Sequence, residues 1–311
     1  DERSGGMRLA TFRDGAGTRI GVVRDGDIVD LARAATLTGE EPPLELRDML
    51  ALIEGGASAL GRARALLEGM PAQAALPLHD AELLAPIPRP RKNVFCLGRN
   101  YAEHAAESLK AIGQEVQLPA YPNVFTKAVT SVSGPFADIP FDASVSEQLD
   151  WEVELAVIIG RAGRHIARED ALAHVFGYSV LNDLTARDIQ NAAGIQWFQG
   201  KSLDGCCPLG PWIVTADEIA DPQRLRLSLR VNGELKQDDT TEHMLFDVAT
   251  IIATLSRVLT LEPGDIIATG TPAGVGFART PPEFLHPGDV IESAVEGIGT
   301  LRNRVVDVAR G

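Results

Sequence analysis

The sequence is poor in cysteine and holds three in 311 residues, at Cys96, Cys206 and Cys207. An odd number with two adjacent members is a poor basis for structural disulfides. No spacing of cysteine and histidine is typical of a zinc site. We therefore expect reduced, buried thiols and a cytoplasmic protein.

Long apolar runs and an excess of positive charge are also missing. No run is long enough to cross a membrane, and no signal-peptide pattern opens the chain. Lysine and arginine number 29 against 43 aspartates and glutamates, so the formal net charge is -14. We therefore expect neither nucleic acid nor a membrane as a partner. A small anion is still an acceptable ligand, because a metal or a few local cations outweigh a distant global charge.

The stretch 150–160 joins an acidic half to an apolar, largely β-branched half, and the apolar half predicts a buried strand. Asp150, Glu152 and Glu154 alternate, so a strand would place them on one face, roughly 7 Å apart. Three like charges on one face are unfavourable without a cation between them. Hard carboxylate oxygens suit Mg²⁺, Mn²⁺ or Ca²⁺. A charged strand end with lysine or arginine partners explains this stretch equally well.

A second predicted strand, residues 176–183, ends at another carboxylate, Asp183. The residues after it open a predicted helix that carries Arg187, and a Gly-Lys-Ser sequence around Lys201 comes further on. These residues add a third candidate ligand and nearby positive charge. They shift the balance towards a metal site.

Residues 102–110 are rich in helix formers, and His104 and Glu107 stand three positions apart on one helix face. A carboxylate beside an imidazole orients the ring for acid–base chemistry. From the spacing alone, a surface pair is the better interpretation. The polar stretch 113–122 that follows predicts a hinge, so we expect residues 101–120 to form a mobile lid.

Four motifs in this order resemble the fumarylacetoacetate hydrolase family, and they span about 93–306. They are Glu152-Val153-Glu154, residues 182–190, Gly200-Lys201-Ser202 and residues 264–272. The resemblance implies a mixed β-sandwich roll around a metal site, usually in a homodimer. Residues 98–101 offer no fourth acidic ligand before the histidine, unlike fumarylacetoacetate hydrolase itself. This favours the shorter bacterial-type members, such as acylpyruvate hydrolases, 2-hydroxyhepta-2,4-diene-1,7-dioate isomerases and oxaloacetate decarboxylase-like enzymes.

The resemblance also implies a role for individual residues. Glu152, Glu154 and Asp183 would bind Mg²⁺, with Mn²⁺ or Ca²⁺ as alternatives. The catalytic residues would be His104, Glu107 and Lys201, with the lid pair activating water rather than lying on the surface. The substrate would be bound by the following residues: Arg99, Tyr101, Lys127, Arg187, Gln190, Gly270 and Thr271.

Two of these positions have a simpler interpretation from sequence alone. Lys127 follows an apolar run and is equally well explained as a solvated lysine at a strand end. The glycine-rich loop 270–276 fails the dinucleotide-binding spacing. Its backbone N–H groups and the Thr271 hydroxyl could bind a carboxylate, or it could be a plain turn.

Together these roles predict a magnesium-dependent hydrolase that cleaves a C–C bond in an acylpyruvate-type β-diketo acid through a metal-stabilised enolate. The same chemistry without attacking water gives isomerisation of a 2-hydroxy-diene-dioate in aromatic catabolism. With a β-carboxylate it gives decarboxylation of an oxaloacetate-type acid. A metal-stabilised binding protein without turnover is the alternative that is not an enzyme. The expected partners are a small anionic 2-oxo acid and a second copy of the chain.

Alternating apolar residues and turn signals predict an α+β, strand-rich fold. A proline-rich connector at 84–91 divides a small N-terminal α+β support domain, 7–85, from the catalytic domain, 92–308. We also expect two hairpins, closed at 25–26 and at 232–233, and helices at 44–67 (interrupted at 55–56), 167–175 and 246–259.

Overall fold

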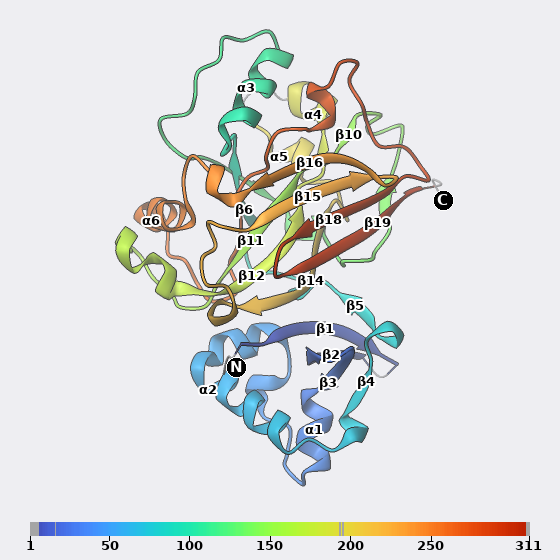
Figure 1. Ribbon diagram of the computed structural model, residues 1–311, viewed down its shortest axis with the longest axis vertical. Helices are drawn as coiled ribbons and strands as arrows, with labels where there is room; N and C mark the ends of the chain where they lie inside the picture. Colours follow the sequence, from blue (N-terminus) through green and yellow to red (C-terminus); the bar gives the residue numbers. More distant parts are fainter. Residues whose placement is uncertain (1–5, 16, 193, 195, 309–311) are drawn as a thin grey trace.

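The computed structural model of the protein describes residues 6–15, 17–192, 194 and 196–308 (Figure 1). The fold is α+β and rich in strands, as the sequence predicts. None of the described helices is long and apolar enough to cross a bilayer.

The α-helices are α1 (Leu31–Leu37), α2 (Met49–Glu68), α3 (Ala102–Ala111), α4 (Arg187–Ala192), α5 (Phe198–Lys201) and α6 (Val248–Val258). The strands are β1 (Arg8–Asp14), β2 (Gly17–Arg24), β3 (Asp27–Asp30), β4 (Ala75–Pro77), β5 (Glu82–Leu84), β6 (Val94–Gly98), β7 (Asn123–Lys127), β8 (Val132–Ser133), β9 (Ile139–Phe141), β10 (Leu149–Asp150), β11 (Val153–Ile159), β12 (Val175–Asn182), β13 (Thr185–Ala186), β14 (Cys207–Thr215), β15 (Arg226–Val231), β16 (Glu234–Thr240), β17 (Ile266–Ala268), β18 (Val290–Val295) and β19 (Gly299–Asp307).

An N-terminal unit at the bottom of Figure 1 contains the antiparallel strands β1 to β3 and the helices α1 and α2. The hairpin between β2 and β3 turns at Asp25 and Gly26, which have φ values of 52° and 85° as such a turn requires. Helix α2 begins after Asp48, whose carboxylate accepts the backbone N–H of Ala51. It bends at Gly56, where φ is 54°. Two helical segments therefore meet at a non-helical residue within α2, at the predicted interruption.

One large sheet joins this unit to the rest of the chain. Strand β1 pairs with β14, and the strand order is β4-β3-β2-β1-β14-β12-β11-β17-β6-β7. A buried apolar cluster follows the sheet across this junction, because Leu9 and Leu52 share it with Ala156 and Ile158 of β11. The division into domains 7–85 and 92–308 stays a prediction, and the sheet and its core are continuous through it.

A second sheet of five strands, in the order β16-β15-β18-β19-β9, packs against the first. Apolar side chains of both sheets form one buried cluster, which includes Leu155 and Val157 of β11 together with Leu229 and Ile291. The hairpin between β15 and β16 turns at residues 232–233 with φ values of 52° and 82°, as the sequence predicts. The acidic end of β11 therefore lies next to a well-packed core.

The helical predictions outside the N-terminal unit differ in outcome. Helix α6 forms as expected, capped by Asp247 and buried through Ile251 and Leu255. The α-helix predicted at 167–175 is wrong, because Arg168–His174 forms a 3-10 helix. No side chain caps its N-terminus, few of its residues are buried, and the chain enters β12 directly after it. Neither capping nor core packing therefore favours a longer α-helix there.

Strand β11 lies inside the large sheet, between β12 and β17, and all of its residues are buried. A solvated edge strand therefore does not explain the acidic stretch. The carboxylate at the start of β11 needs partners within the protein, because burial of an unpaired charge is costly.

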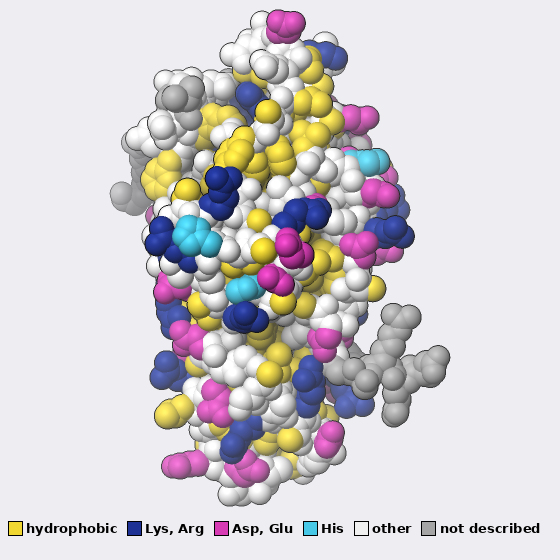
Figure 2. All heavy atoms as spheres, turned by 90° about the vertical axis from the view of Figure 1, so that its left-hand side faces the viewer, with side chains coloured by type: hydrophobic (Ala, Val, Ile, Leu, Met, Phe, Trp, Pro, Cys, Tyr) yellow, Lys and Arg dark blue, Asp and Glu magenta, His cyan; other side chains and the backbone are white. Residues whose placement is uncertain are grey.

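Figure 2 shows the face that lies on the left of Figure 1. Hydrophobic side chains gather on its upper part, at the height of α3, and charged side chains of both signs are spread over the rest. The segment after α3 contributes exposed large apolar side chains, namely Ile112, Val116, Leu118 and Tyr121. The predicted lid region thus leaves apolar surface uncovered.

Candidate metal centre and substrate pocket

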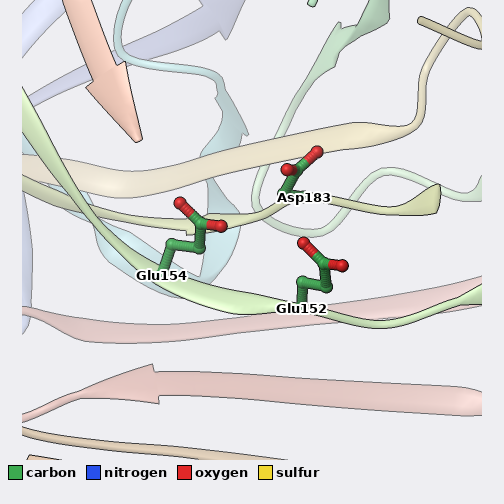
Figure 3. A group of neighbouring side chains, drawn as sticks. All are labelled: Glu152, Glu154 and Asp183. Atoms are coloured by element: carbon green, nitrogen blue, oxygen red, sulfur yellow. The ribbon is translucent and has the colours of Figure 1, made fainter. Parts of the chain in front are cut away.

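Three buried carboxylates converge where β11 and β12 lie side by side (Figure 3). Glu154 belongs to β11, Glu152 directly precedes that strand, and Asp183 directly follows β12. Each offers one oxygen atom, and these atoms lie within 4.8 Å of one another. The structure thus brings together the three side chains that the sequence predicts as metal ligands.

Hydrogen bonds hold the backbone beneath these carboxylates. Val153 pairs with Asn182 in the strand register. The backbone N–H of Asp183 donates to the Glu152 carbonyl at 2.8 Å, and the Glu152 N–H donates to Asn182 Oδ1 at 3.0 Å. These buried hydrogen bonds hold together the two backbone segments that carry Glu152 and Asp183. Sequence reasoning missed this role of Asn182.

Two lysine ammonium groups lie among the carboxylates. Lys201 Nζ donates to Glu152 Oε2 and to Asp183 Oδ2, at 2.7 Å each. Lys127 Nζ lies 2.8 Å from Asp183 Oδ1 and donates to the Leu184 carbonyl at 2.9 Å. Burial disfavours the Lys127 charge, but Asp183 raises its pKa above the usual value. Since Lys127 is 0% exposed, its interpretation as a solvated strand-end lysine is wrong.

Arg187, the first residue of α4, contacts two carboxylates. Its Nε donates to Asp150 Oδ2 at 2.8 Å, Nη2 to Glu152 Oε1 at 2.6 Å, and Nη1 to Gln190 Oε1 at 3.1 Å. Asp150 also accepts the backbone N–H of Gly276 at 2.7 Å. The alternation of Asp150 with the two glutamates predicted that all three would share one face. The structure differs, because Asp150 does not join the carboxylate cluster. It lies in β10, which pairs with β13 instead of continuing β11.

The surroundings shift the pKa values of the two glutamates in opposite directions. Burial, Asp183 and Glu152 all disfavour charge on Glu154, so its pKa lies well above the usual value. The backbone N–H of Gly270, which donates to Glu154 Oε2 at 2.7 Å, offsets this only in part. Burial also disfavours the charge on Glu152, but the neighbouring cations, led by Lys201, lower its pKa to about 2. The charged form of Glu154 is therefore disfavoured in this cluster unless another cation arrives.

The donor set fits a divalent cation that prefers oxygen. All three side chains offer carboxylate oxygens, which are the ligands of Mg²⁺, Mn²⁺ and Ca²⁺. Asp183 Oδ1 is buried and accepts no hydrogen bond of good geometry, although Lys127 Nζ is close. It therefore keeps a lone pair for a cation. A cation would also neutralise Glu154, whose own surroundings disfavour its charge. Mg²⁺ itself remains a prediction.

The pair His104 and Glu107 lies on α3 and is held inside the protein. His104 is 5% exposed, and its Nδ1 lies 3.1 Å from Glu107 Oε1. The Glu107 carboxylate accepts the backbone N–H groups of Gly274 at 3.0 Å and Val275 at 3.5 Å. The surface-pair interpretation is therefore wrong, whereas the catalytic role stays a prediction. Nε2 has only a long contact, 3.5 Å from Ser108 Oγ, and is the ring nitrogen that we expect to transfer a proton.

A cavity of about 760 Å³ adjoins the carboxylates. The predicted site residues that line it are Arg99, His104, Glu152, Arg187, Gln190, Lys201 and Thr271. The other predicted site residues do not belong to its lining, and these are Tyr101, Glu107, Lys127, Glu154, Asp183 and Gly270.

Sequence reasoning missed the aromatic walls of this cavity, which are Phe125, Trp197 and Phe277. The rings of Phe125 and Trp197 pack edge to face with centroids 5.4 Å apart. The ring centroid of Phe277 lies 4.2 Å from the guanidinium carbon of Arg187. One usable signal was Trp197, which stands four residues before Lys201 and therefore near it on a helical turn. The two phenylalanines belong to distant segments and carry no such signal.

The Gly270–Gly276 loop is tied to β11 rather than being a plain turn. Thr271 Oγ1 donates to the Val153 carbonyl at 2.9 Å and accepts from Gln237 Nε2 at 2.8 Å. Gln237 Oε1 accepts the Val153 N–H at 3.0 Å in return. These bonds fix the loop against the strand that carries Glu154. Sequence reasoning did not identify Gln237.

Comparison with known proteins matches residues 93–306 to a family described as fumarylacetoacetate (FAA) hydrolase, C-terminal. Oxaloacetate tautomerase YisK of Bacillus subtilis (strain 168) is 49% identical over 228 residues, which cover 73% of this chain and 74% of that protein. The mitochondrial oxaloacetate tautomerase Fahd2a of Rattus norvegicus is 44% identical over 261 residues, which cover 84% of this chain and 80% of that protein.

Solved structures resemble nearly the whole chain. A fumarylacetoacetate hydrolase from the psychrophilic Exiguobacterium antarcticum has a TM-score of 0.80 and 42% identity, covering 97% of this chain and 100% of that one. Maleylpyruvate hydrolase from Sphingobium sp. SYK-6, solved in complex with manganese (II) ion and pyruvate, has a TM-score of 0.77 and 36% identity, with the same coverage of 97% and 100%.

Proposed function

This chain belongs to the fumarylacetoacetate hydrolase family and is an enzyme, and on that premise we propose that it interconverts the keto and enol forms of a small 2-oxo acid. Oxaloacetate is the first candidate substrate, because the two curated relatives described above are named oxaloacetate tautomerases. A binding protein without turnover is no longer a competing explanation.

One observation carries the proposal. The cavity is lined both by Glu152, a member of the carboxylate cluster, and by His104, whose imidazole ring can accept and return a proton. Tautomerisation needs these two functions together. It moves one proton between a carbon and an oxygen, and it needs no attacking water and no bond cleavage beyond C–H.

The residues of the chain would divide this work as follows. Glu152, Glu154 and Asp183 would hold a divalent cation, which would supply Lewis-acid polarisation of the keto oxygen. His104 Nε2 accepts a proton from the neighbouring carbon, and Glu107 stabilises the positive ring through Nδ1. Return of the proton to the oxygen gives the enol, and the reverse sequence gives the keto form.

Positive side chains support the same reaction. Lys201 and Arg187 line the cavity beside Glu152 and favour the negative charge that develops on the substrate oxygen. The backbone N–H of Gly274 holds the Glu107 carboxylate, so the dyad keeps its orientation when the lid is closed.

The test follows the enol absorbance of oxaloacetate in the ultraviolet, with enzyme and Mg²⁺ or Mn²⁺. We expect enzyme-dependent relaxation to the keto–enol equilibrium, which EDTA abolishes and added metal restores. Pyruvate and bicarbonate are measured in parallel to separate tautomerisation from decarboxylation. An enzyme that leaves the relaxation rate of oxaloacetate unchanged at saturating metal would rule the proposal out.

Hydrolysis of an acylpyruvate-type substrate, expected from the sequence, is the second candidate. It is supported by the buried His104–Glu107 pair, which could orient water, and by the likeness to maleylpyruvate hydrolase. Release of pyruvate from an acylpyruvate panel, detected with lactate dehydrogenase, measures it directly. Isomerisation of a 2-hydroxy-diene-dioate belongs in the same panel, because a relative at 32% identity and TM-score 0.74 is a 2-hydroxyhepta-2,4-diene-1,7-dioate isomerase from Mycobacterium marinum.

A further inference from the structure

Three lysine or arginine side chains of the described chain line the cavity, and two of them already have anionic partners. Arg187 contacts Asp150 and Glu152, and Lys201 contacts Glu152 and Asp183. Arg99 lines the same cavity, and across residues 6–15, 17–192, 194 and 196–308 no carboxylate forms an ion pair with it. Among these three cations, Arg99 is therefore the one whose charge a bound ligand can still neutralise.

The surroundings of Arg99 and Arg187 differ accordingly. Burial lowers the pKa of the Arg99 guanidinium, and no carboxylate opposes that effect. Burial acts on Arg187 too, but Asp150 and Glu152 raise its pKa. A partly buried cation without an anion is unfavourable. A guanidinium group matches a carboxylate with two parallel hydrogen bonds, so an incoming carboxylate is its natural partner.

Aromatic contacts hold the Arg99 side chain against the cavity wall. Its guanidinium carbon lies 5.6 Å from the ring centroid of Trp197, a distance at which a cation is attracted to the ring face. Trp197 in turn packs on Phe125, whose ring centroid is 5.0 Å from Lys201 Nζ. A continuous series of contacts thus connects Arg99 with the lysine of the carboxylate cluster.

The backbone around Arg99 is also built to hold it there. Arg99 has a φ of 56°, which is uncommon for a residue other than glycine. Asn100 anchors this turn, because its side chain donates to the Thr269 and Phe246 carbonyls at 2.8 and 3.0 Å. Gly98 leaves room for Trp197, since a Cβ atom there would lie 2.4 Å from the Trp197 ring.

We propose that Arg99, held on the face of Trp197, binds a second carboxylate at the far end of the substrate, so that the site selects 2-oxo acids with an anionic tail. The metal end of the ligand lies at the carboxylate cluster, and the tail lies at Arg99. This inference rests on the proposed function for the orientation of the 2-oxo acid. Trp197 acts as a positioning residue, because it contacts Arg99 rather than the reacting atoms.

The test compares ligands in matched pairs that differ only in ending with a carboxylate or a methyl group. The pairs are oxaloacetate and 2-oxobutanoate, 2-oxoglutarate and 2-oxopentanoate, and 2-oxoadipate and 2-oxohexanoate. Calorimetry with Mn²⁺-loaded protein gives their dissociation constants, and oxalate serves as a probe of the metal end alone. The pair with the largest preference for the diacid shows the tail length that reaches Arg99.

We expect Arg99→Gln to weaken diacid binding about 10- to 100-fold, because a charge-assisted hydrogen bond is lost. Binding of oxalate and of the methyl-ended acids should be unchanged. Arg99→Lys should keep part of the preference, since it keeps the charge but not the planar group. Arg13→Gln, an exposed arginine paired with Glu82 in the N-terminal unit, is the matched control and should change nothing.

Substitutions of Trp197 test whether this residue positions Arg99. Trp197→Leu should reduce the diacid preference while oxalate binding stays normal, and Trp197→Phe should restore most of it by keeping an aromatic face. If Trp197→Leu lowers the affinity for both members of every pair equally, the residue shapes the pocket and does not hold Arg99.

This binding test is independent of turnover. If the wild-type protein fails to tautomerise oxaloacetate, the proposed function fails, while loss of the diacid preference in Arg99→Gln still supports the tail site. If turnover of oxaloacetate is found but Arg99→Gln weakens diacids and methyl-ended acids by the same factor, the tail site is overturned and the function stands. A wild-type protein without diacid preference in all three pairs also overturns the tail site.

Discussion

Asp183 contacts both buried lysines of the site, Lys127 at 2.8 Å and Lys201 at 2.7 Å. Asp183→Asn removes the negative charge between them and a predicted metal ligand at once. We expect Mn²⁺ affinity to fall by more than the roughly 10- to 100-fold typical of changes just outside the ligand set. We expect the free energy of unfolding of the metal-free protein to fall by roughly 3–5 kcal/mol, because a buried ion pair loses one partner. Calorimetric titration and chemical denaturation measure the two effects.

Asp238→Asn is the matched control for this substitution. Asp238 is exposed, pairs with Arg226 on the second sheet and is not a member of the carboxylate cluster. Surface ion pairs contribute little to stability, so neither Mn²⁺ affinity nor stability should change appreciably. Wild-type Mn²⁺ affinity in Asp183→Asn would remove this residue from the ligand set.

His104 is a predicted catalytic residue and is not a predicted metal ligand. His104→Ala should lower the rate of oxaloacetate tautomerisation by roughly 10²- to 10⁴-fold, the range of general acid–base contributions. Mn²⁺ and oxalate binding should be kept, because the three carboxylates remain. His79→Ala, at an exposed position in the N-terminal unit, is the control. Full activity of His104→Ala on tautomerisation and on hydrolysis would show that the buried pair is structural.

At the scale of elements, α3 and the segment after it are attached to the site by few contacts. Glu107 accepts the N–H groups of Gly274 and Val275, and Tyr101 forms an isolated bridge with Met244. Residues 112–122 form no helix or strand in the described structure. The lid thus has a firm attachment at its start and little regular structure after it, which suits a segment that opens and closes.

Hydrogen exchange tests the lid. Amides of residues 112–122 should exchange faster than those of β11, whose N–H groups are buried in the large sheet. Mn²⁺ with oxalate should slow exchange in α3, because a filled cavity favours the closed arrangement. Helix α6 lies outside the cavity lining and provides the internal control. Exchange at 112–122 as slow as in β11, with and without ligand, would contradict a mobile lid.

At the scale of the whole molecule, the buried charges link pH, metal and stability. With Glu154 protonated, Asp150, Glu152 and Asp183 face the cations Lys127, Arg187 and Lys201. Positive and negative charges then balance. A divalent cation changes this balance and favours loss of the Glu154 proton. Metal binding should therefore release a proton and become tighter as pH rises.

The two glutamates affect metal-free stability in opposite pH ranges. The pKa of Glu154 is raised, so its contribution is complete below the usual value near 4.5 and is lost as pH rises through the raised pKa. The pKa of Glu152 is lowered to about 2, so its contribution is present above 4.5 and is lost as pH falls towards 2. A bound cation would stabilise ionised Glu154. Metal should therefore prevent the loss of stability that the metal-free protein shows as pH rises.

We therefore expect the difference in Tm between Mn²⁺-loaded and EDTA-treated protein to grow as pH rises from the usual glutamate value of 4.5 through the raised pKa of Glu154. Calorimetry in two buffers with different ionisation enthalpies should detect the released proton. Glu154→Gln cannot release one, so its Mn²⁺ affinity should be weaker and nearly independent of pH over that range. Proton release of equal size in Glu154→Gln and the wild type would assign the proton to another group.

The homodimer implied by the family resemblance is a further prediction at this scale. Size-exclusion chromatography with light scattering gives a mass to compare with the 33.2 kDa of one chain. A mass of one chain at all concentrations would contradict it.

Local features of the sequence were enough to determine part of this structure. The turns at 25–26 and 232–233 follow from residues that accept positive φ, and the apolar run of β11 follows from its composition. The family resemblance is confirmed, and the three carboxylates that it nominated do converge. Such features are readable because turn conformation and strand burial depend on neighbouring residues, and because a motif preserves the order of its ligands.

Other features were decided only by the tertiary structure. Asp150 leaves the carboxylate cluster because its strand pairs elsewhere, and Lys127 is buried because Asp183 comes to lie beside it. Glu107 depends on the N–H of Gly274, which is 167 positions away in the chain. The free charge of Arg99 became visible only once the partners of the other two cavity cations were known. Ion pairing and burial depend on distances in space, and the spacing of residues along a chain does not encode which distant groups will meet.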